Sequence, residues 1–367
     1  MSGRALTEDT PTTNFAAACS DDGVPAATIC TAGDHDYFPG VVALINSLRV
    51  VDFGDAIVVL DLGFTEDQRA RLGRVARLVP VPSDSGTPRL ATSANAKSHV
   101  AELKLSGVVI WIDSDIIVTA PLDDVIAAAS AGKICVIQDD GVEDTFRIYE
   151  AWPEAYGLRH QLRVGTYVNG GFFALSTDHW PELLTRFSEA CARIPRNAVG
   201  VGSPSTNPFW GSDQDALNAV LMSEVEPSAL HYLNPSEMVP TRMLPKASVR
   251  DAKRLDVAFD ERRTRFLHAA WAPKPWMPGA WTLLGRNAYV ELLPRLLFAP
   301  DIALPLDSSE VPPWLWATFA GSIVRAAVRM QRGARRLVGL GARKLPAPVR
   351  ARALAVGDRF DDWARSR

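Results

Sequence analysis

The chain has 367 residues, of which 47% are hydrophobic and 22% charged, a composition that excludes disordered and collagen-like proteins. This length predicts one large domain or two modest ones, with a core that needs neither disulfides nor a structural metal. The four cysteines, Cys19, Cys30, Cys135 and Cys191, include no C-x-x-C pair, which excludes zinc ribbons and thioredoxin-type sites and favours a reducing compartment.

Charge is distributed unevenly around a formal net charge of -3. Residues 311–367 carry 12 Lys and Arg against 3 Asp and Glu, so the remainder is acidic. An acidic body repels phosphates, which argues against a nucleic-acid partner. Residues 1–23 lack an apolar segment typical of a secretory signal, and no apolar run reaches the length of a membrane span. We therefore expect a cytoplasmic protein.

Strands and helices are predicted to alternate over about 280 residues. In chain order, the expected elements are a strand at 26–31, a helix at 41–48, a strand at 56–60, a helix from a capping box at Thr65 through Arg77, an edge strand at 79–82, a helix at 94–103, a strand at 108–112, a helix at 121–131, strands at 134–137 and 171–175, a helix at 211–222 and a strand at 266–268. This alternation predicts an α/β fold.

Three regions are expected: a flexible N-terminal segment (1–24), one α/β domain (25–300), and a Pro-rich linker with a basic helical tail (301–367). Trp314, Trp316 and Phe319 precede several arginines in this tail. Aromatic and basic side chains at helical spacing are typical of peripheral contact with an anionic membrane surface, here the inner face of the membrane. The same pattern also fits a tail packed on its own domain or on another subunit of an oligomer.

Two carboxylates, Asp113 and Asp115, follow the apolar run VVIWI. Ligands bind beyond the carboxyl ends of strands in open α/β sheets, and alternate residues of an extended segment point the same way. The pair therefore has the geometry and the oxygen donors for a divalent cation. The alternative is a pair of turn-forming residues at a strand end.

Three later segments each have a functional and a structural interpretation. His268 is a candidate metal ligand or a structural histidine, and Lys274 a phosphate-binding or a solvated lysine. Asp213 and Gln214 point into a pocket or simply complement the helix dipole. Asn169 contacts a polar ligand or forms a tight bend. The dinucleotide fingerprint, the Walker A sequence and the G-x-S-x-G elbow are absent.

Taken in order, these segments resemble the family-8 glycosyltransferases. The resemblance covers about residues 25–280 and rests on these stretches: TAGDHDYFPGVVALINSL (31–48), Lys97, the D-x-D motif (113–115), Asn169-Gly170-Gly171, DQDALN (213–218) and HAAWAPKPW (268–276). One departure is Trp271, which stands where the family has a glycine that lets the backbone approach the diphosphate.

The resemblance implies a single GT-A type nucleotide-binding domain with a mostly parallel central sheet flanked by helices, and a UDP-sugar donor. It implies Asp113, Asp115 and His268 as ligands of Mn²⁺, with Mg²⁺ as the other candidate. It implies donor contacts by Thr31, Ala32, Asp34, Asp36, Tyr37, Lys97, Asp113, Ser114, Asn169, Gly170 and Lys274. Asp213 and Gln214 would be the catalytic residues, beside the transferred sugar.

The family retains the anomeric configuration, which implies a retaining hexosyltransferase making a glycan, a glycolipid or a glycosylated metabolite. Because an amide such as Gln214 is a feeble nucleophile, we expect front-face attack by the acceptor hydroxyl, with Asp213 orienting the sugar or stabilising positive charge. Two alternatives stay open. One is a sugar-nucleotide-binding protein without transfer activity, and the other is a sugar nucleotidyltransferase, which the acidic 33–36 turn disfavours.

Overall fold

The structure is a computed structural model that describes residues 27–81, 96–139, 147–195, 197–270, 273–277, 287–312 and 315. The predicted N-terminal segment 1–24, the basic tail from residue 316 onward, and Trp271 lie outside the described residues. No helix among the described residues is long and apolar enough to cross a membrane.

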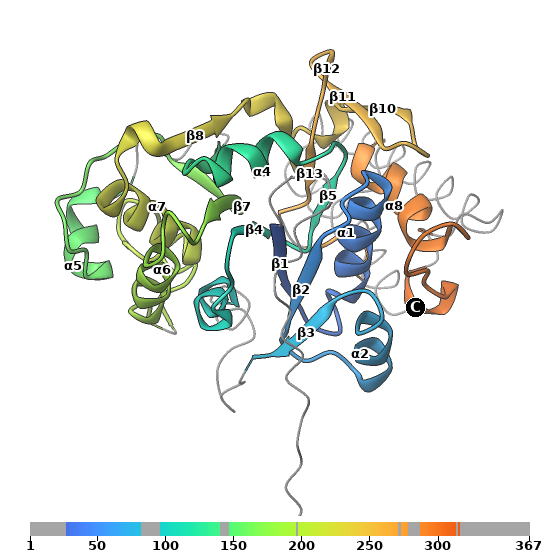
Figure 1. Ribbon diagram of the computed structural model, residues 1–367, viewed down its shortest axis with the longest axis horizontal. Helices are drawn as coiled ribbons and strands as arrows, with labels where there is room; N and C mark the ends of the chain where they lie inside the picture. The colour runs from blue at the N-terminus through green and yellow to red at the C-terminus, as the bar shows by residue number, and fades with distance from the viewer. Residues whose placement is uncertain are drawn as a thin grey trace, which may run out of the picture.

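A seven-stranded sheet lies at the centre of the described structure (Figure 1). Its strands are β1 (Ala27–Gly33), β2 (Ala56–Asp61), β3 (Arg77–Pro80), β4 (Val108–Ile112), β6 (Ile134–Gln138), β7 (Val168–Ser176) and β8 (Leu230–Leu233). The order is β3-β2-β1-β4-β7-β6-β8, in which only β7 runs antiparallel to its neighbours. The predicted α/β fold with a mostly parallel sheet is confirmed.

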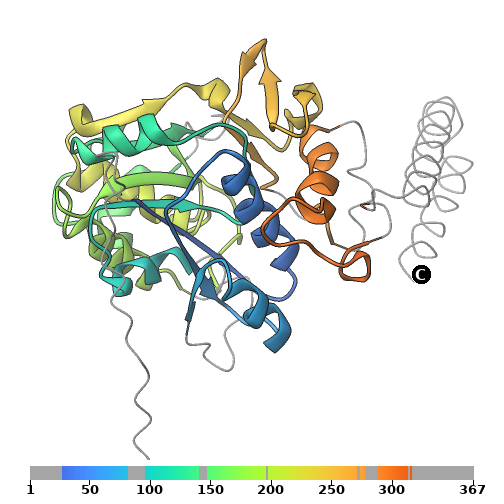
Figure 2. The same cartoon turned by 45° about the vertical axis from the view of Figure 1, so that its right-hand side comes forward.

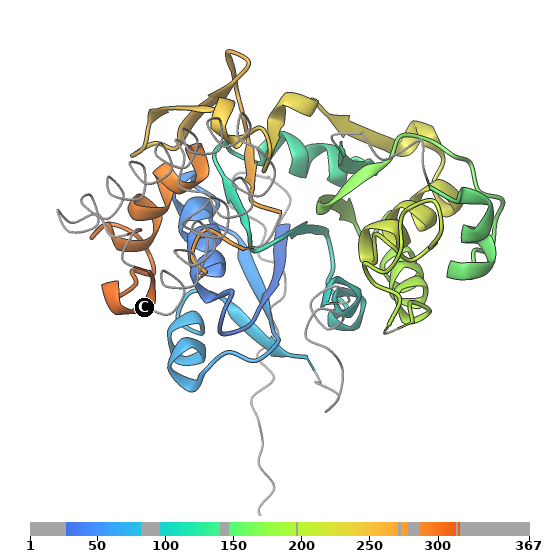
Figure 3. The same ribbon diagram turned by 180° about the vertical axis from the view of Figure 1, so that it is seen from behind.

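Alternate side chains along each strand enter two hydrophobic clusters, one on each face of the sheet. Ile29 and Ile110 belong to the cluster that packs on α1 (Phe38–Val50), α4 (Asp123–Ser130) and α8 (Ala288–Phe298). Cys30 and Trp111 belong to the other, which packs on the 3-10 helix η1 (Ala96–Leu103), α5 (Trp152–Tyr156), α6 (Leu183–Ala192) and α7 (Asp213–Glu224). Figure 2 shows α8 beside α1, and Figure 3 shows α6 and α7 together on the other side.

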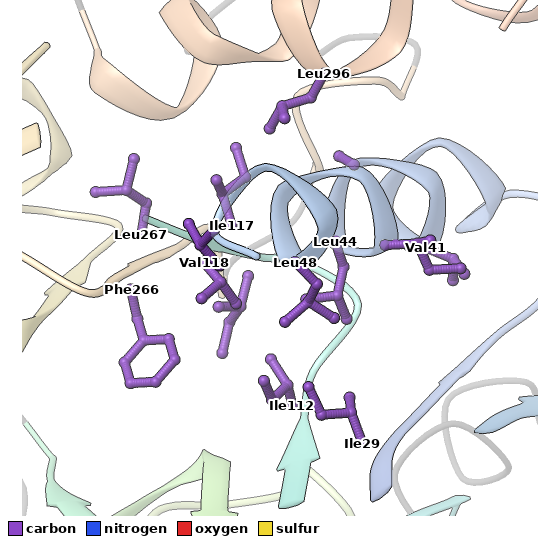
Figure 4. Packing of buried hydrophobic residues seen from close by; sticks show 14 of the residues in the cluster. Ile29, Val41, Leu44, Leu48, Ile112, Ile117, Val118, Phe266, Leu267 and Leu296 are labelled. Carbon is purple, nitrogen blue, oxygen red and sulfur yellow. The ribbon is translucent and has the colours of Figure 1, made fainter. Parts of the chain in front are cut away.

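Helix α1 is deeply buried along almost its whole length. Leu44 and Leu48 lie between Ile29 and Ile112 of the sheet and Leu296 of α8, as Figure 4 shows. Each of these side chains is fully buried, which stabilises the fold by about 1.5–3 kcal/mol per residue. This packing fixes the turn before α1, which carries several of the predicted donor contacts.

Two small sheets extend the domain. One consists of β5 (Ile116–Val118), β13 (Phe266–His268) and β9 (Met238–Pro240), and the other of β10 (Ser248–Asp251), β11 (Asp256–Phe259) and β12 (Arg262–Arg263). β13 runs antiparallel to β5, with His268 opposite Ile116. This pairing brings the chain back to the end of β4 after a separation of about 150 residues.

Two predicted boundaries were wrong, and one helix is of another type. The helix after the Thr65 capping box, α2 (Glu66–Leu72), ends at Leu72 instead of continuing to Arg77, because Arg77 already pairs with Val58 of β2 as the first residue of the edge strand. The predicted helix at 94–103 is a 3-10 helix over its described residues, 96–103. β7 begins at Val168 rather than Gly171, since its first residue pairs with Gln138 of β6.

Candidate active site

A cavity of about 230 Å³ lies at the carboxyl ends of β1 and β4. It is lined by Ala32, Gly33, Asp34, Tyr37, Leu62, Lys97, Trp111, Asp113, Ser114, Asp115 and Asp213. Eight of these residues are among the predicted site residues, drawn from four separate stretches of sequence. The parallel strands explain this convergence, because their carboxyl ends meet at the same edge of the sheet.

The three residues predicted as metal ligands lie together. One ligand atom from each of Asp113, Asp115 and His268 can be chosen so that all three lie within 4.8 Å of one another. The pairing of β13 with β5 places His268 Nε2 3.3 Å from Asp115 Oδ1. Gly171 leaves room for the imidazole, since a Cβ there would lie 2.7 Å from His268 Cε1.

Unpaired polar atoms support a cation at this position. Asp115 Oδ1 and His268 Nδ1 are both buried without a hydrogen-bond partner among the described residues. Leaving a buried polar atom unpaired costs about 1–3 kcal/mol, so such atoms in a cluster call for a missing partner. Two carboxylates and an imidazole are a donor set that fits a divalent cation such as Mn²⁺.

Two buried lysines balance the acidic groups. Lys97 Nζ lies 2.7 Å from Asp213 Oδ2 and 3.2 Å from Asp113 Oδ1, while Lys274 Nζ lies 2.5 Å from Asp115 Oδ2. Burial works to lower the pKa of Lys97, but the charges of Asp113 and Asp213 raise it above its usual value. Burial works to raise the pKa of Asp115, yet Lys274 and His268 hold it below its usual range.

The resulting charge repels an anionic ligand unless a cation is present. Four carboxylates, Asp34, Asp113, Asp115 and Asp213, stand against the Lys97 and Lys274 ammonium groups, which leaves two net negative charges. A dication would cancel that charge and so remove the repulsion of an anionic ligand.

The turn before α1 forms the other wall of the cavity. Asp34 is buried, and its Oδ1 accepts hydrogen bonds from the backbone N–H groups of Asp36 and Tyr37, at 3.0 and 3.1 Å. Tyr37 stands edge-on to Trp276, with ring centroids 6.1 Å apart. Trp276 Nε1 donates to the Asp36 carbonyl at 2.9 Å, which joins this turn to the Lys274 segment.

Gln214 and Asn169 belong to a hydrogen-bond network beside the cavity. Gln214 Oε1 accepts from the N–H of Gly170 at 2.8 Å, and its Nε2 donates to Asp139 Oδ2 at 3.1 Å. Asn169 Nδ2 donates to the other oxygen of Asp139 at 3.0 Å. The alternative interpretation of Asn169, a tight bend, is wrong, because Asn169 and Gly170 lie within β7.

The structure places the remaining predicted residues outside the cavity lining. Thr31 is buried in β1, and the Asp36 side chain is 42% exposed and paired with His35. The cavity lining does not include Asn169, Gly170, Gln214, His268 or Lys274. Three of them still contact residues of the lining. Lys97 Nζ donates to the Gly170 carbonyl at 2.7 Å, and His268 and Lys274 contact Asp115.

Besides Gly33 and Leu62 of the cavity lining, sequence reasoning missed three residues at or beside the site. Trp111 lines the cavity, and its Nε1 donates to Asp113 Oδ1 at 2.7 Å. Asp139 bridges Asn169 and Gln214, and Arg147 pairs with Asp215. Trp111 had a signal in the sequence, since it precedes Asp113 by two positions and so lies on the same side of an extended chain. Asp139 had one too, since it follows the predicted strand at 134–137.

A close approach at Gly40 fixes the start of α1 against the site. A Cβ at Gly40 would lie 2.5 Å from the Ser114 carbonyl oxygen and 2.6 Å from the Trp276 ring. We expect Gly40→Ala to destabilise the protein by about 1–3 kcal/mol, because overpacking outweighs the gain in helix propensity. Chemical unfolding measures this loss.

Gly54→Ala is the matched control for that variant. No heavy atom lies within 4 Å of a Cβ built at Gly54. We expect Gly54→Ala to raise the free energy of unfolding by about 0.4–1 kcal/mol, because alanine reduces the conformational entropy of the unfolded chain. An equal loss of stability in the two variants would contradict the packing argument at Gly40.

Comparison with known proteins gives structural likenesses alone. No family model and no curated protein match the chain. Similar solved structures include the bifunctional glycosyltransferase WbbM, at 16% identity and a TM-score of 0.48, where the match covers 73% of this chain and 50% of that one. The galactosyltransferase LgtC, in complex with donor and acceptor sugar analogs, matches at 17% identity and a TM-score of 0.46, over 75% of this chain and 98% of that one.

A third similar structure is the glycosyltransferase GlyE of Streptococcus pneumoniae TIGR4, at 14% identity and a TM-score of 0.43, over 68% of this chain and 56% of that one. This chain thus spans about half the length of WbbM and of GlyE. All three are glycosyltransferases, the class that the sequence motifs resemble. Because one fold hosts many activities, the function here has to come from the residues of the site.

Proposed function

We propose that this protein is a metal-dependent glycosyltransferase that moves a hexose from a UDP-sugar to an acceptor hydroxyl with retention of configuration. The observation that carries the proposal is that Asp113 and Asp115 line one cavity with Tyr37 and Lys97 and form a compact group with His268. A bound Mn²⁺ would act as a Lewis acid on the leaving diphosphate. The chain's own residues would supply binding and orientation.

The turn before α1 is proposed to hold the uridine. Tyr37 lies half-buried at the cavity wall, where its ring offers a face for the base, and the buried Asp34 carboxylate lines the same wall. Trp276 packs edge-on against Tyr37 and so fixes the position of the Tyr37 ring. This wall is apolar and aromatic on one side and acidic on the other, which suits a base and a ribose hydroxyl.

Asp213 and Gln214 are proposed to face the transferred sugar from the start of α7. Ser212, just before them, has φ 54°, in the left-handed region that favours glycine, so the backbone is strained where the two side chains emerge. Burial raises the pKa of Asp213 against the opposing charge of Lys97. The Gln214 amide is held on both sides by Gly170 and Asp139, which suits a positioning group better than a nucleophile.

The experiment that tests this function is a thermal-shift screen of UDP-sugars with and without Mn²⁺, followed by measurement of UDP release. A ligand at 100 times its Kd stabilises the folded protein by about 2.7 kcal/mol, so the preferred donor should stand out. UDP release at the uncatalysed rate from every common UDP-sugar would defeat the transferase proposal. A Mn²⁺-dependent shift without turnover would then support the alternative of a sugar-nucleotide-binding protein.

The attack geometry has its own test. Front-face attack requires no covalent glycosyl-enzyme intermediate, so incubation with donor alone should leave the protein mass unchanged. A glycosyl adduct on Asp213, or on another carboxylate, would overturn this part of the proposal and leave the transfer activity itself standing.

A further inference from the structure

Lys274 has an unusual environment for a residue proposed to bind phosphate. Its side chain is 5% exposed, and its ammonium donates to Asp115 Oδ2 at 2.5 Å and to the Ala269 and Ala270 carbonyl oxygens at 2.8 Å each. The Tyr37 ring lies on another side, with its centroid 5.9 Å from Nζ. The nitrogen is thus enclosed by the metal-binding carboxylate, two carbonyls and an aromatic ring.

These contacts use the full donor capacity of the side chain. A lysine ammonium has three N–H groups and no acceptor, and three protein oxygens surround this one. Lys274 therefore has no N–H left for a diphosphate in this arrangement. To bind one, it must give up a protein partner.

Asp115 is the partner whose loss can be compensated. The Ala269 and Ala270 carbonyls are five and four residues from Lys274 in the chain, so they stay close to Nζ through local geometry. Asp115 is a buried carboxylate whose other oxygen lies 3.3 Å from His268 Nε2. A dication at Asp115 would supply the positive charge that the lysine now provides, whereas leaving that carboxylate bare would cost several kcal/mol.

We infer that Lys274 holds Asp115 in the ligand-free protein and exchanges it for the diphosphate of the nucleotide when a dication binds Asp115. This inference rests on the proposed function. The exchange makes the metal and the diphosphate each favour binding of the other, because either ligand alone leaves a buried charge without a partner. By linkage, the coupling is the same whichever ligand binds first. Lys274 is then a coupling residue as well as a phosphate ligand.

The test measures Mn²⁺ affinity by isothermal titration calorimetry, with and without saturating UDP, in the wild type and in Lys274→Met. In the variant, Mn²⁺ alone should bind about tenfold more tightly, because the competing ammonium is gone. The factor by which UDP raises Mn²⁺ affinity should fall by at least about tenfold, which corresponds to about 1.4 kcal/mol of coupling. Lys246→Met, at an exposed lysine, should change neither quantity.

An unchanged coupling factor in Lys274→Met would overturn the exchange and leave the proposed function intact, since Lys274 would then stay on Asp115 throughout. A wild-type protein that binds neither Mn²⁺ nor UDP would overturn both. A crystal structure of the wild type with Mn²⁺ and UDP provides a second measurement that does not depend on the variant. It should show Nζ bonded to a phosphate oxygen, and an Nζ still bonded to Asp115 would refute the exchange.

Discussion

Asp113→Asn is expected to abolish the Mn²⁺-dependent part of the thermal shift and to lower turnover of the preferred UDP-sugar by at least about 100-fold. Asp113 contributes a negatively charged oxygen to the metal-binding group, and its side chain is 26% exposed toward the cavity. An amide oxygen in that place is a weaker ligand for a hard dication. Calorimetric titration with Mn²⁺ and a UDP-release assay measure the two losses.

This variant should fold normally, which makes the prediction a test of function. Asparagine keeps an oxygen that can accept the hydrogen bond from Trp111 Nε1, and Lys97 keeps its contacts with Asp213 and the Gly170 carbonyl. Asp260→Asn, at an exposed residue of the β11–β12 turn, is the matched control and should leave both measurements unchanged. Full Mn²⁺ binding by Asp113→Asn would remove this residue from the metal site.

Asp215→Asn should lower the free energy of unfolding by about 3–5 kcal/mol, more than Gly40→Ala or Glu226→Gln. Asp215 and Arg147 form an ion pair in which each side chain is only 2% exposed. Asp215 also accepts hydrogen bonds from Tyr167 Oη at 2.7 Å and from the Gly211 N–H at 2.6 Å. Loss of its charge would remove the buried counterion that Asp215 provides to the Arg147 guanidinium. Urea unfolding measures the effect.

Glu226→Gln provides the comparison, since it removes one charge from an exposed ion pair. Glu226 is 72% exposed and its partner Arg163 is 38% exposed, so we expect a loss below about 1 kcal/mol. The double variant Arg147→Met with Asp215→Leu should recover part of the lost stability, because it removes both buried charges together. Equal losses in Asp215→Asn and Glu226→Gln would show that burial of the Arg147–Asp215 pair has no energetic consequence.

The sequence by itself determined the frame of the sheet and the place of the acidic pair. The apolar run at 108–112 predicted a strand buried on both faces, and all five of its residues are buried in β4. The polar residues that follow had to emerge at the carboxyl edge, so Asp113 and Asp115 could be placed at a cavity before the structure was known. Local patterns suffice here because strand periodicity and turn chemistry act over a few residues.

Only the tertiary structure decided which distant groups meet there. His268 reaches Asp115 because β13 pairs with β5 in one register, and a shift by one residue would turn the imidazole to the other face. Arg147 reaches Asp215 across 68 positions of sequence, and Lys274 reaches Asp115 across 159. Such contacts depend on which distant strands pair and on how far burial removes water from the charges. The spacing of residues along the chain gives neither the strand pairing nor the burial.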